Sequence, residues 1–174
     1  PSPQEAPQSS LSHMMEVVRT TYGRDGSGYY IEGGRLQSEQ LAADLLEAST
    51  PICLLGTSFS FVHFIDFFEQ KGRPCPLPRG SRLMDTGGLK GKSRTVPPEW
   101  IYQKAESLWG IPRNYCVNEY GMTEMTSQFY DGIIGTDLKF PRAYMTPPQV
   151  KTRVLSPETL EPVAKGEIGI LAHY

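Results

Sequence analysis

The sequence lacks most of the features that would assign it to a specialised class of protein. Its 3 cysteines are an odd number without a Cys-x-x-Cys pair, which argues against a disulfide framework and against a zinc site. Its 3 histidines are scattered and show no metal-ligand spacing. No apolar run approaches the roughly 18 residues of a membrane span. These absences favour a protein of the reducing cytoplasm without a membrane span.

An excess of charge of one sign is also missing. The formal net charge is −2, so the chain has no strong electrostatic attraction for nucleic acid or an anionic membrane. Hydrophobic residues make up 39% and charged residues 21% of the 174 residues, which is the profile of a globular domain with a core. Residues 1–5 lack the charged and apolar regions of a signal peptide. Because the chain does not start with Met, we expect it to be a piece of a longer protein.

Hydrophobic periodicity predicts an alternation of helices and strands. Helices are expected over residues 12–20, 38–48, 58–70 and 98–109, and strands over residues 52–55, 81–84 and 115–117. Such alternation indicates a parallel sheet. Past residue 130 the helical period stops, and residues 150–154 and 168–171 predict an antiparallel hairpin. The predicted fold class is α/β, a layered sheet of mostly parallel strands flanked by helices, followed by the start of a small antiparallel β subdomain.

The same patterns divide the chain into three regions. Residues 1–35 are Pro-, Ser- and Gly-rich and are expected to be a partly irregular lead-in. Residues 36–135 form the α/β subdomain, and residues 136–174 begin the β-rich subdomain.

One short stretch, residues 118–124, concentrates polar chemistry directly after the strand expected over residues 115–117. We expect a Gly-containing turn there, and such turns at strand ends are where α/β sheets place ligands. Tyr120 suits stacking on a nucleobase, Thr123 suits a hydrogen bond to a phosphate, and Glu124 offers oxygen ligands to a magnesium ion. The alternative is a polar loop that caps a following helix, and residue types alone do not decide between the two.

Two further Gly-rich turns are present. Gly87 and Gly88 follow the strand expected over residues 81–84, and paired glycines let a flat or anionic ligand approach the backbone. An ordinary flexible turn with solvated lysines is the alternative. Parallel strands bring this turn and residues 118–124 to one edge of the sheet. Residues 23–28 only superficially suggest a phosphate-binding loop, since no Lys-Ser/Thr ending follows, and a hairpin turn is favoured.

Residues 118–124 resemble the Tyr-Gly-x-Thr-Glu motif of adenylate-forming enzymes, the superfamily of acyl-CoA synthetases, firefly-type luciferases and nonribosomal peptide adenylation domains. Other stretches resemble one branch of it, the LuxE-type acyl-protein synthetases of bacterial bioluminescence. These stretches are residues 55–59, 82–91, 125–131, 154–160 and 166–169. Together the resemblance covers most of residues 36–174, in the same order.

The resemblance implies an ATP-dependent acid–thiol ligase that uses Mg²⁺. A carboxylic acid, usually a long-chain fatty acid in this branch, would attack the α-phosphate of ATP and give an acyl-adenylate and pyrophosphate. The acyl group would then pass to a protein cysteine, in company with an acyl reductase and an acyltransferase. The alternatives are an acyl-CoA ligase of the same superfamily and a binding or scaffold module that has lost catalysis.

The resemblance also implies roles for residues of the motif. Tyr120 matches the aromatic residue that packs on adenine, Thr123 the hydroxyl near the α-phosphate, and Glu124 the carboxylate that binds magnesium. Thr123 and Glu124 would therefore be catalytic. Asn118, Glu119 and Gly121 lie in the same nucleotide-binding motif.

Residues outside the motif are matched in the same way. Gly87 and Gly88 match the paired glycines of the adenine pocket, and Lys90 fits the Gly-Gly-x-Lys-Gly pattern of the branch and is assigned a phosphate contact. Phe59 and His63 follow a strand end where the superfamily builds its acyl pocket. For His63 the alternative is a partly buried helix residue.

Several parts of the superfamily pattern have no counterpart in the sequence. These are the Ser/Thr/Gly-rich phosphate loop, the acidic ribose-binding motif, the lid domain with its lysine, and the acyl-accepting cysteine. We expect Cys53 and Cys116 to be inert core thiols and Cys75, between two prolines, to be more exposed.

Overall fold

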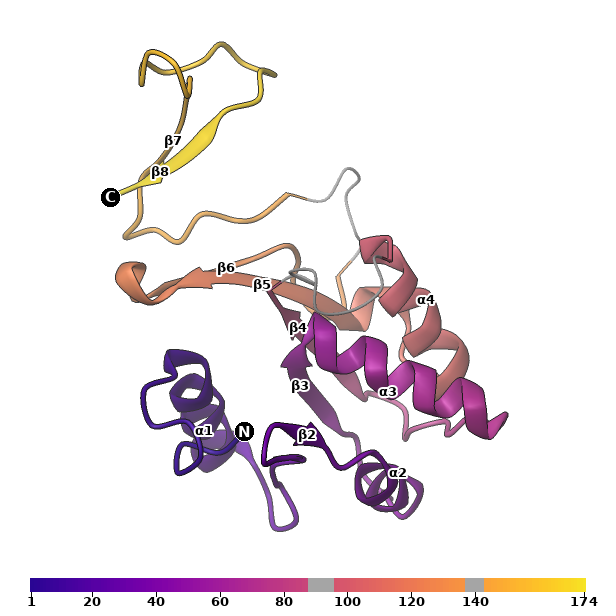
Figure 1. Ribbon diagram of the computed structural model, residues 1–174. Helices are drawn as coiled ribbons and strands as arrows, with labels where there is room; N and C mark the ends of the chain where they lie inside the picture. The colour runs from indigo at the N-terminus through magenta and orange to yellow at the C-terminus, as the bar shows by residue number, and fades with distance from the viewer. Residues whose placement is uncertain (88–95, 137–142) are drawn as a thin grey trace.

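The computed structural model describes residues 1–87, 96–136 and 143–174. Its centre is a four-stranded sheet in the order β3-β4-β5-β6 (Figure 1). The strands are β3 (Cys53–Thr57), β4 (Arg82–Thr86), β5 (Cys116–Met122) and β6 (Ser127–Tyr130). The first three are parallel, and β6 runs antiparallel to β5. The predicted mixed α/β fold with a mostly parallel sheet is confirmed.

Helices connect the parallel strands, as crossover connections require. Helices α3 (Ser58–Lys71) and α4 (Pro98–Trp109) cover one face of the sheet, and α2 (Ser38–Leu46) packs at the β3 side (Figure 1). The Thr57 hydroxyl caps α3 by accepting a hydrogen bond from the backbone N–H of Ser60. Gly110 ends α4 with φ of 68°, a left-handed conformation that glycine adopts without strain.

The core lies between these helices and the sheet. The Trp109 side chain is fully buried, and the rings of Phe61, Phe64 and Phe68 surround it at centroid distances of 6.4, 5.4 and 6.0 Å. The three phenylalanines follow the i, i+3, i+7 spacing of one helix face, so the periodicity of α3 correctly predicts its buried side.

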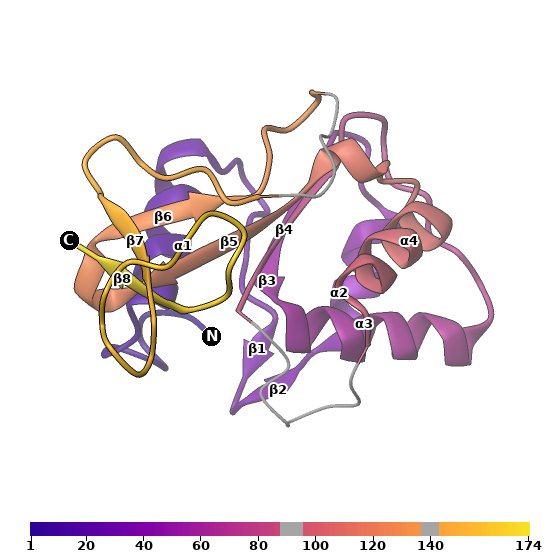
Figure 2. The ribbon, with the colours of Figure 1, turned by 90° about the horizontal axis from the view of Figure 1, so that it is seen from above.

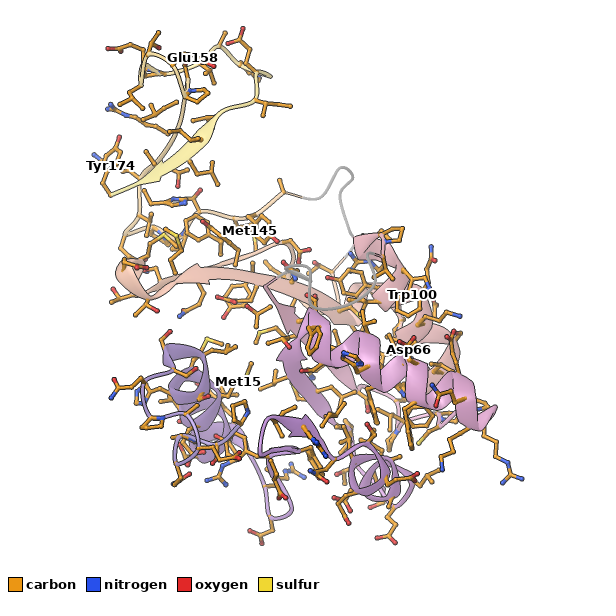
Figure 3. All side chains as sticks on the ribbon, in the orientation of Figure 1. Met15, Asp66, Trp100, Met145, Glu158 and Tyr174 are labelled. Atoms are coloured by element: carbon orange, nitrogen blue, oxygen red, sulfur yellow. The ribbon has the colours of Figure 1, made fainter. Side chains whose placement is uncertain are left out.

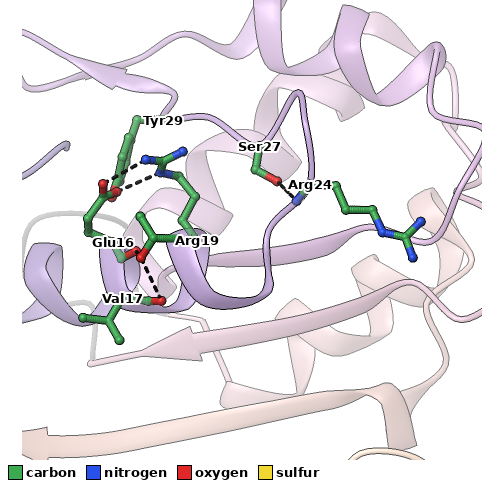
Figure 4. A network of polar contacts seen from close by, with 7 residues as sticks. Glu16, Val17, Arg19, Arg24, Ser27 and Tyr29 are labelled. Atoms are coloured by element: carbon green, nitrogen blue, oxygen red, sulfur yellow. Dashed lines mark hydrogen bonds and ion pairs between the residues drawn. The ribbon is translucent and has the colours of Figure 1, made fainter.

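The amino-terminal part includes a helix on the other side of the sheet from α3 and α4, and a hairpin that lies beside α3 (Figure 1). Helix α1 (Ser10–Tyr22) lies below the β5–β6 hairpin, and a small hairpin, β1 (Ile31–Glu32) and β2 (Arg35–Leu36), precedes α2 (Figures 1 and 2). Hydrogen bonds from Arg19 (2.8 Å) and Tyr29 (2.6 Å) hold the Glu16 carboxylate and lower its pKa to about 2 (Figure 4). Residues 23–28 form a turn between α1 and β1 and do not open a helix.

The carboxy-terminal part is a two-stranded antiparallel ribbon of β7 (Thr152–Leu155) and β8 (Ile170–His173). It confirms the hairpin expected there, and Figure 3 shows Glu158 at its far turn and Tyr174 at its near end. Within the described ranges, none of the helices is long and apolar enough to cross a membrane.

Some local predictions need correction. Helix α2 ends at Leu46 rather than at residue 48. The largest difference concerns residues 118–124, which do not form a turn after a strand that ends at Val117. Strand β5 runs on to Met122 because β6 pairs with it from Glu119 onward.

Candidate functional site

The carboxyl ends of β3 and β4 lie in a row with the middle of β5, which runs on past them. Thr57 of β3 pairs with Thr86 of β4, and Thr86 pairs with Glu119 of β5. The residues that continue from these three positions are the first turn of α3, Gly87 and Tyr120. The register therefore brings three of the predicted site segments to adjacent positions, as expected for ligand sites in α/β sheets.

The hairpin after Glu119 presents the polar residues of the motif. β5 ends at Met122, the single 3₁₀ turn η2 (Thr123–Met125) reverses the chain, and β6 returns it. Thr126 completes this turn with φ of 50°. Because the strand β6 and not an α-helix follows the turn, the alternative of a helix-capping loop is wrong.

Glu119 points inward and supports the strand ends. Only 4% of its surface is exposed, and its carboxylate accepts a hydrogen bond from the Thr86 hydroxyl. Gly121 lies on the same face of β5, and a Cβ added there would lie 2.5 Å from Oε1 of Glu119. Glycine at position 121 thus leaves the space that this buried carboxylate occupies.

Gly121→Ala is therefore expected to lower the free energy of unfolding by about 1–3 kcal/mol, because the methyl group displaces the Glu119 carboxylate. Urea unfolding followed by circular dichroism measures the change. Gly28→Ala is the matched control, since a Cβ at Gly28 meets nothing within 4 Å, and it should leave stability unchanged or raise it by up to about 1 kcal/mol. Equal stabilities of the two variants would show that Gly121 does not make room for Glu119.

Asn118 is held by contacts with three segments. Its Nδ2 donates to the backbone oxygen of Asp85 (3.2 Å), its backbone N–H donates to Oδ1 of Asp131 (2.7 Å), and its Oδ1 accepts from the Tyr144 hydroxyl. Burial raises the pKa of Asp131, and the Asn118 N–H opposes that rise. The amide of Asn118 is thus fixed at the junction of β4, β5 and the segment after β6.

Tyr120 lies in a group of aromatic rings. Its ring centroid is 5.7 Å from that of Phe129, 5.8 Å from Tyr144 and 6.0 Å from His173. The hydroxyl of Tyr120 lies 3.5 Å from Nε2 of His173, whose Nδ1 lies 3.0 Å from the Thr152 hydroxyl. The ribbon β7–β8 therefore contacts the motif through His173, a neighbour that the sequence does not reveal because it lies 53 residues further along the chain.

Thr123 and Glu124 are exposed on η2. The hydroxyl of Thr123 lies 2.9 Å from that of Ser10, which brings the start of α1 against the motif. Among the described residues, no three His, Cys, Asp or Glu side chains converge on a point where a metal ion would bind. One exposed carboxylate still fits Mg²⁺ that is carried by a nucleotide, because this ion commonly takes one or two protein carboxylates, phosphate oxygens and water.

A cavity opens beside the amino-terminal turns of α3. It has a volume of about 640 Å³, and its apolar walls are Ile31, Leu36, Phe59 and Phe67. The rings of Phe59 and His63 both line it and pack edge to face, 4.4 Å apart. Asp66, labelled on α3 in Figure 3, also lines it. His63 is exposed rather than partly buried. The structure brings both predicted acyl-pocket residues, Phe59 and His63, to one cavity.

The cysteines differ from expectation in two of three cases. Cys116 is fully buried as predicted, and burial raises the pKa of its thiol to about 12. Cys75 is only 2% exposed, because its backbone N–H donates to the Leu108 carbonyl (2.8 Å) and fixes the Pro-rich loop against α4. Cys53 is exposed, since it begins the edge strand β3. Gly88 and Lys90 lie outside the described residues.

Comparisons with known proteins identify the fold. Neither the protein-family models nor the curated proteins give a match to the sequence. Solved structures do match: apo MatB from Rhodopseudomonas palustris (16% identity, TM-score 0.53) and a long-chain-fatty-acid–CoA ligase, FadD1, from Archaeoglobus fulgidus (15% identity, TM-score 0.54). The chain has the fold of part of such a ligase. Each match covers 81% of this chain but only 25% of MatB and 28% of FadD1, so the chain spans about a quarter of their length.

Proposed function

We propose that the chain carries part of the active site of an ATP-dependent enzyme that activates a carboxylic acid as an acyl-adenylate. The observation that carries this proposal is the row of Thr57, Thr86 and Glu119, in which the ends of β3 and β4 lie beside the middle of β5. A cavity with both apolar and polar walls lies beside Thr57, the turn of Gly87 follows Thr86, and the Tyr-Gly-x-Thr-Glu hairpin follows Glu119. An acid in the cavity and a nucleotide at the hairpin would thus be neighbours.

The motif residues receive the following roles. Tyr120 packs on the adenine ring, and Asn118 and Gly121 lie beside it. The buried Glu119 carboxylate supports the strand through its hydrogen bond with Thr86. Gly87 lines the adenine pocket, and Gly88, which lies outside the described residues, is assigned the same role from the resemblance. Thr123 donates its hydroxyl to the α-phosphate, and Lys90 contacts a phosphate. These groups act by positioning the nucleotide and by neutralising its charge.

Glu124 would hold Mg²⁺, which when bound neutralises the phosphate oxygens. In the first half-reaction a carboxylate oxygen of the acid forms a bond to the α-phosphorus while the bond to pyrophosphate breaks. Pyrophosphate leaves with the electron pair. In the second, a thiolate sulfur attacks the acyl carbonyl and AMP leaves. Phe59 and His63 would contact the acid in the cavity.

We further propose a long-chain fatty acid as the substrate and a cysteine of a protein as the acceptor, within the cytoplasm and in company with an acyl reductase and an acyltransferase. The patterns over residues 82–91 and 125–131 support this acyl-protein branch. Regions 36–135 and 136–174 would be a nucleotide-binding subdomain and the start of a β-rich subdomain. The printed name of FadD1 favours the second candidate, an acyl-CoA ligase.

The acceptor is identified by incubating the full-length protein with labelled palmitate, ATP and Mg²⁺, with and without coenzyme A. We expect label on a protein band that hydroxylamine removes, without a need for coenzyme A. A labelled coenzyme A thioester and an unlabelled protein would assign the chain to the acyl-CoA ligases. Absence of both products would favour a binding or scaffold module.

A further inference from the structure

Three buried polar side chains meet between α3, β4 and α4. Ser58 is 5% exposed, Asp85 2% and Tyr102 3%, and each comes from a different element. The hydroxyl of Tyr102 donates to Oδ1 of Asp85 at 2.7 Å, and the hydroxyl of Ser58 lies 2.6 Å from Oδ2 of the same carboxylate. Burying an ionisable group is costly unless its hydrogen bonds are satisfied, so this arrangement requires an explanation.

The hydrogen bonds lead from the core to the edge of the sheet. The Ser58 hydroxyl also lies 2.9 Å from the carbonyl oxygen of Gly87, the first residue after β4, so its single proton is shared between this carbonyl and the Asp85 carboxylate. Gly87 is exposed and has φ of 71°, so side-chain packing does not hold it in place. Ser58 therefore joins an exposed turn to a carboxylate inside the core.

The inner end of this path is fixed as well. The Arg113 guanidinium lies 3.8 Å from the centre of the Tyr102 ring and makes two hydrogen bonds to the Glu99 carboxylate, of 2.7 and 2.8 Å. Burial and the nearby Asp85 carboxylate raise the pKa of Tyr102, so its hydroxyl remains a donor. These contacts hold the Tyr102 ring in place, and its hydroxyl orients the Asp85 carboxylate through their hydrogen bond.

We propose that Ser58, Asp85 and Tyr102 are positioning residues that set the place of the Gly87 carbonyl at the carboxyl end of β4. The effect on nucleotide affinity rests on the proposed function, in which Gly87 is a wall of the adenine pocket. The effect on the turn does not depend on that function. A hydroxyl at Ser58 is required because only a donor of this length reaches the carbonyl from the first turn of α3.

Ser81 provides a matched control at the other end of the same strand. Ser81 is 3% exposed. Its hydroxyl donates to the Pro78 carbonyl (2.7 Å) and accepts from the Ile52 N–H (3.0 Å). Ser58→Ala and Ser81→Ala each remove one buried, hydrogen-bonded hydroxyl. Both should therefore lose similar stability, and only one of them alters the turn at Gly87.

The test combines hydrogen–deuterium exchange with kinetics on the full-length protein. In Ser58→Ala we expect amide exchange at Thr86 and Gly87 to accelerate about tenfold, because the turn opens locally more often. The KM for ATP in acid-dependent pyrophosphate exchange should rise about tenfold while kcat changes less than about twofold. Ser81→Ala should change neither quantity, and Ser58→Thr should restore both.

Tyr102→Phe gives a second readout, since it keeps the ring and removes only the hydroxyl bound to Asp85. We expect a smaller change of the same sign in the exchange at Gly87. Equal exchange at Gly87 in the Ser58→Ala and Ser81→Ala variants overturns the proposal. If the wild-type protein catalyses no pyrophosphate exchange, the proposed function fails, and the deuterium exchange still decides whether the three residues position the turn.

Discussion

Replacing Glu124 with alanine is expected to lower acid-dependent formation of acyl-adenylate by about 100-fold or more, because the carboxylate that would hold the metal beside the phosphates is removed. Hydroxylamine trapping of the acyl-adenylate as a hydroxamate measures the rate. The side chain is exposed on η2, and exposed substitutions change stability by only about 0.5 kcal/mol, so the variant should unfold like the wild type.

Glu158→Ala is the control for this variant. Glu158 is also exposed and lies on the far turn of the β7–β8 ribbon, where its carboxylate accepts from the Ser156 hydroxyl (2.8 Å). The Glu158→Ala variant should form acyl-adenylate at the rate of the wild type. A Glu124→Ala protein with an unchanged rate would remove Glu124 from the proposed site.

Trp109→Ala should have the largest effect on stability, a loss of about 3–5 kcal/mol, because a fully buried aromatic side chain leaves a cavity. Three phenylalanine rings of α3 contact the indole, so its removal opens the interface between α3 and α4. Domains of this size are commonly stable by about 5–15 kcal/mol, and the loss is therefore a large share of the total. Urea unfolding followed by circular dichroism gives the value.

Trp100 on the same helix is the matched control. Its side chain is only partly buried, and the Lys104 ammonium lies 5.9 Å from its ring centre. Trp100→Ala should cost less than half as much as Trp109→Ala. If both variants lose the same stability, the core does not depend on the cluster around Trp109.

The sequence predicts elements well where one periodicity decides the structure. Helix α3 is an example: its apolar residues recur at helical spacing, Thr57 caps it and Gly72 ends it with φ of 66°. The parallel order of β3, β4 and β5 follows from the helices between them. These features are local, so propensity and pattern carry the information.

The hairpin at residues 118–130 could not be predicted in the same way. Whether β5 stops at Val117 or continues depends on pairing with β6, which begins at Ser127, and pairing between strands is not a local property. In the structure Ser127 and Phe129 of β6 are buried and alternate with partly exposed residues, as in a strand with one covered face. The roles assigned to the short motif stay a prediction, whereas the turn expected for its backbone is wrong.

Tertiary contacts decide the remaining differences. Cys75 is buried because the Pro-rich loop bonds to the end of α4, and that contact joins residues 33 positions apart, Cys75 and Leu108. The partners of Tyr120 come from β6, β8 and the segment around Tyr144. The burial of Asp85 could not be predicted from the sequence either, since its two donors, Ser58 and Tyr102, come from α3 and α4.

We propose that the row of Thr57, Thr86 and Glu119 forms part of an acid-activating ATP site. Exchange of labelled pyrophosphate into ATP by the full-length protein tests it most directly, with and without a long-chain fatty acid. We expect exchange that requires the acid and Mg²⁺ and that is lost in Glu124→Ala. Exchange that proceeds equally well without any acid, or no exchange with fatty acids of any length, would contradict it.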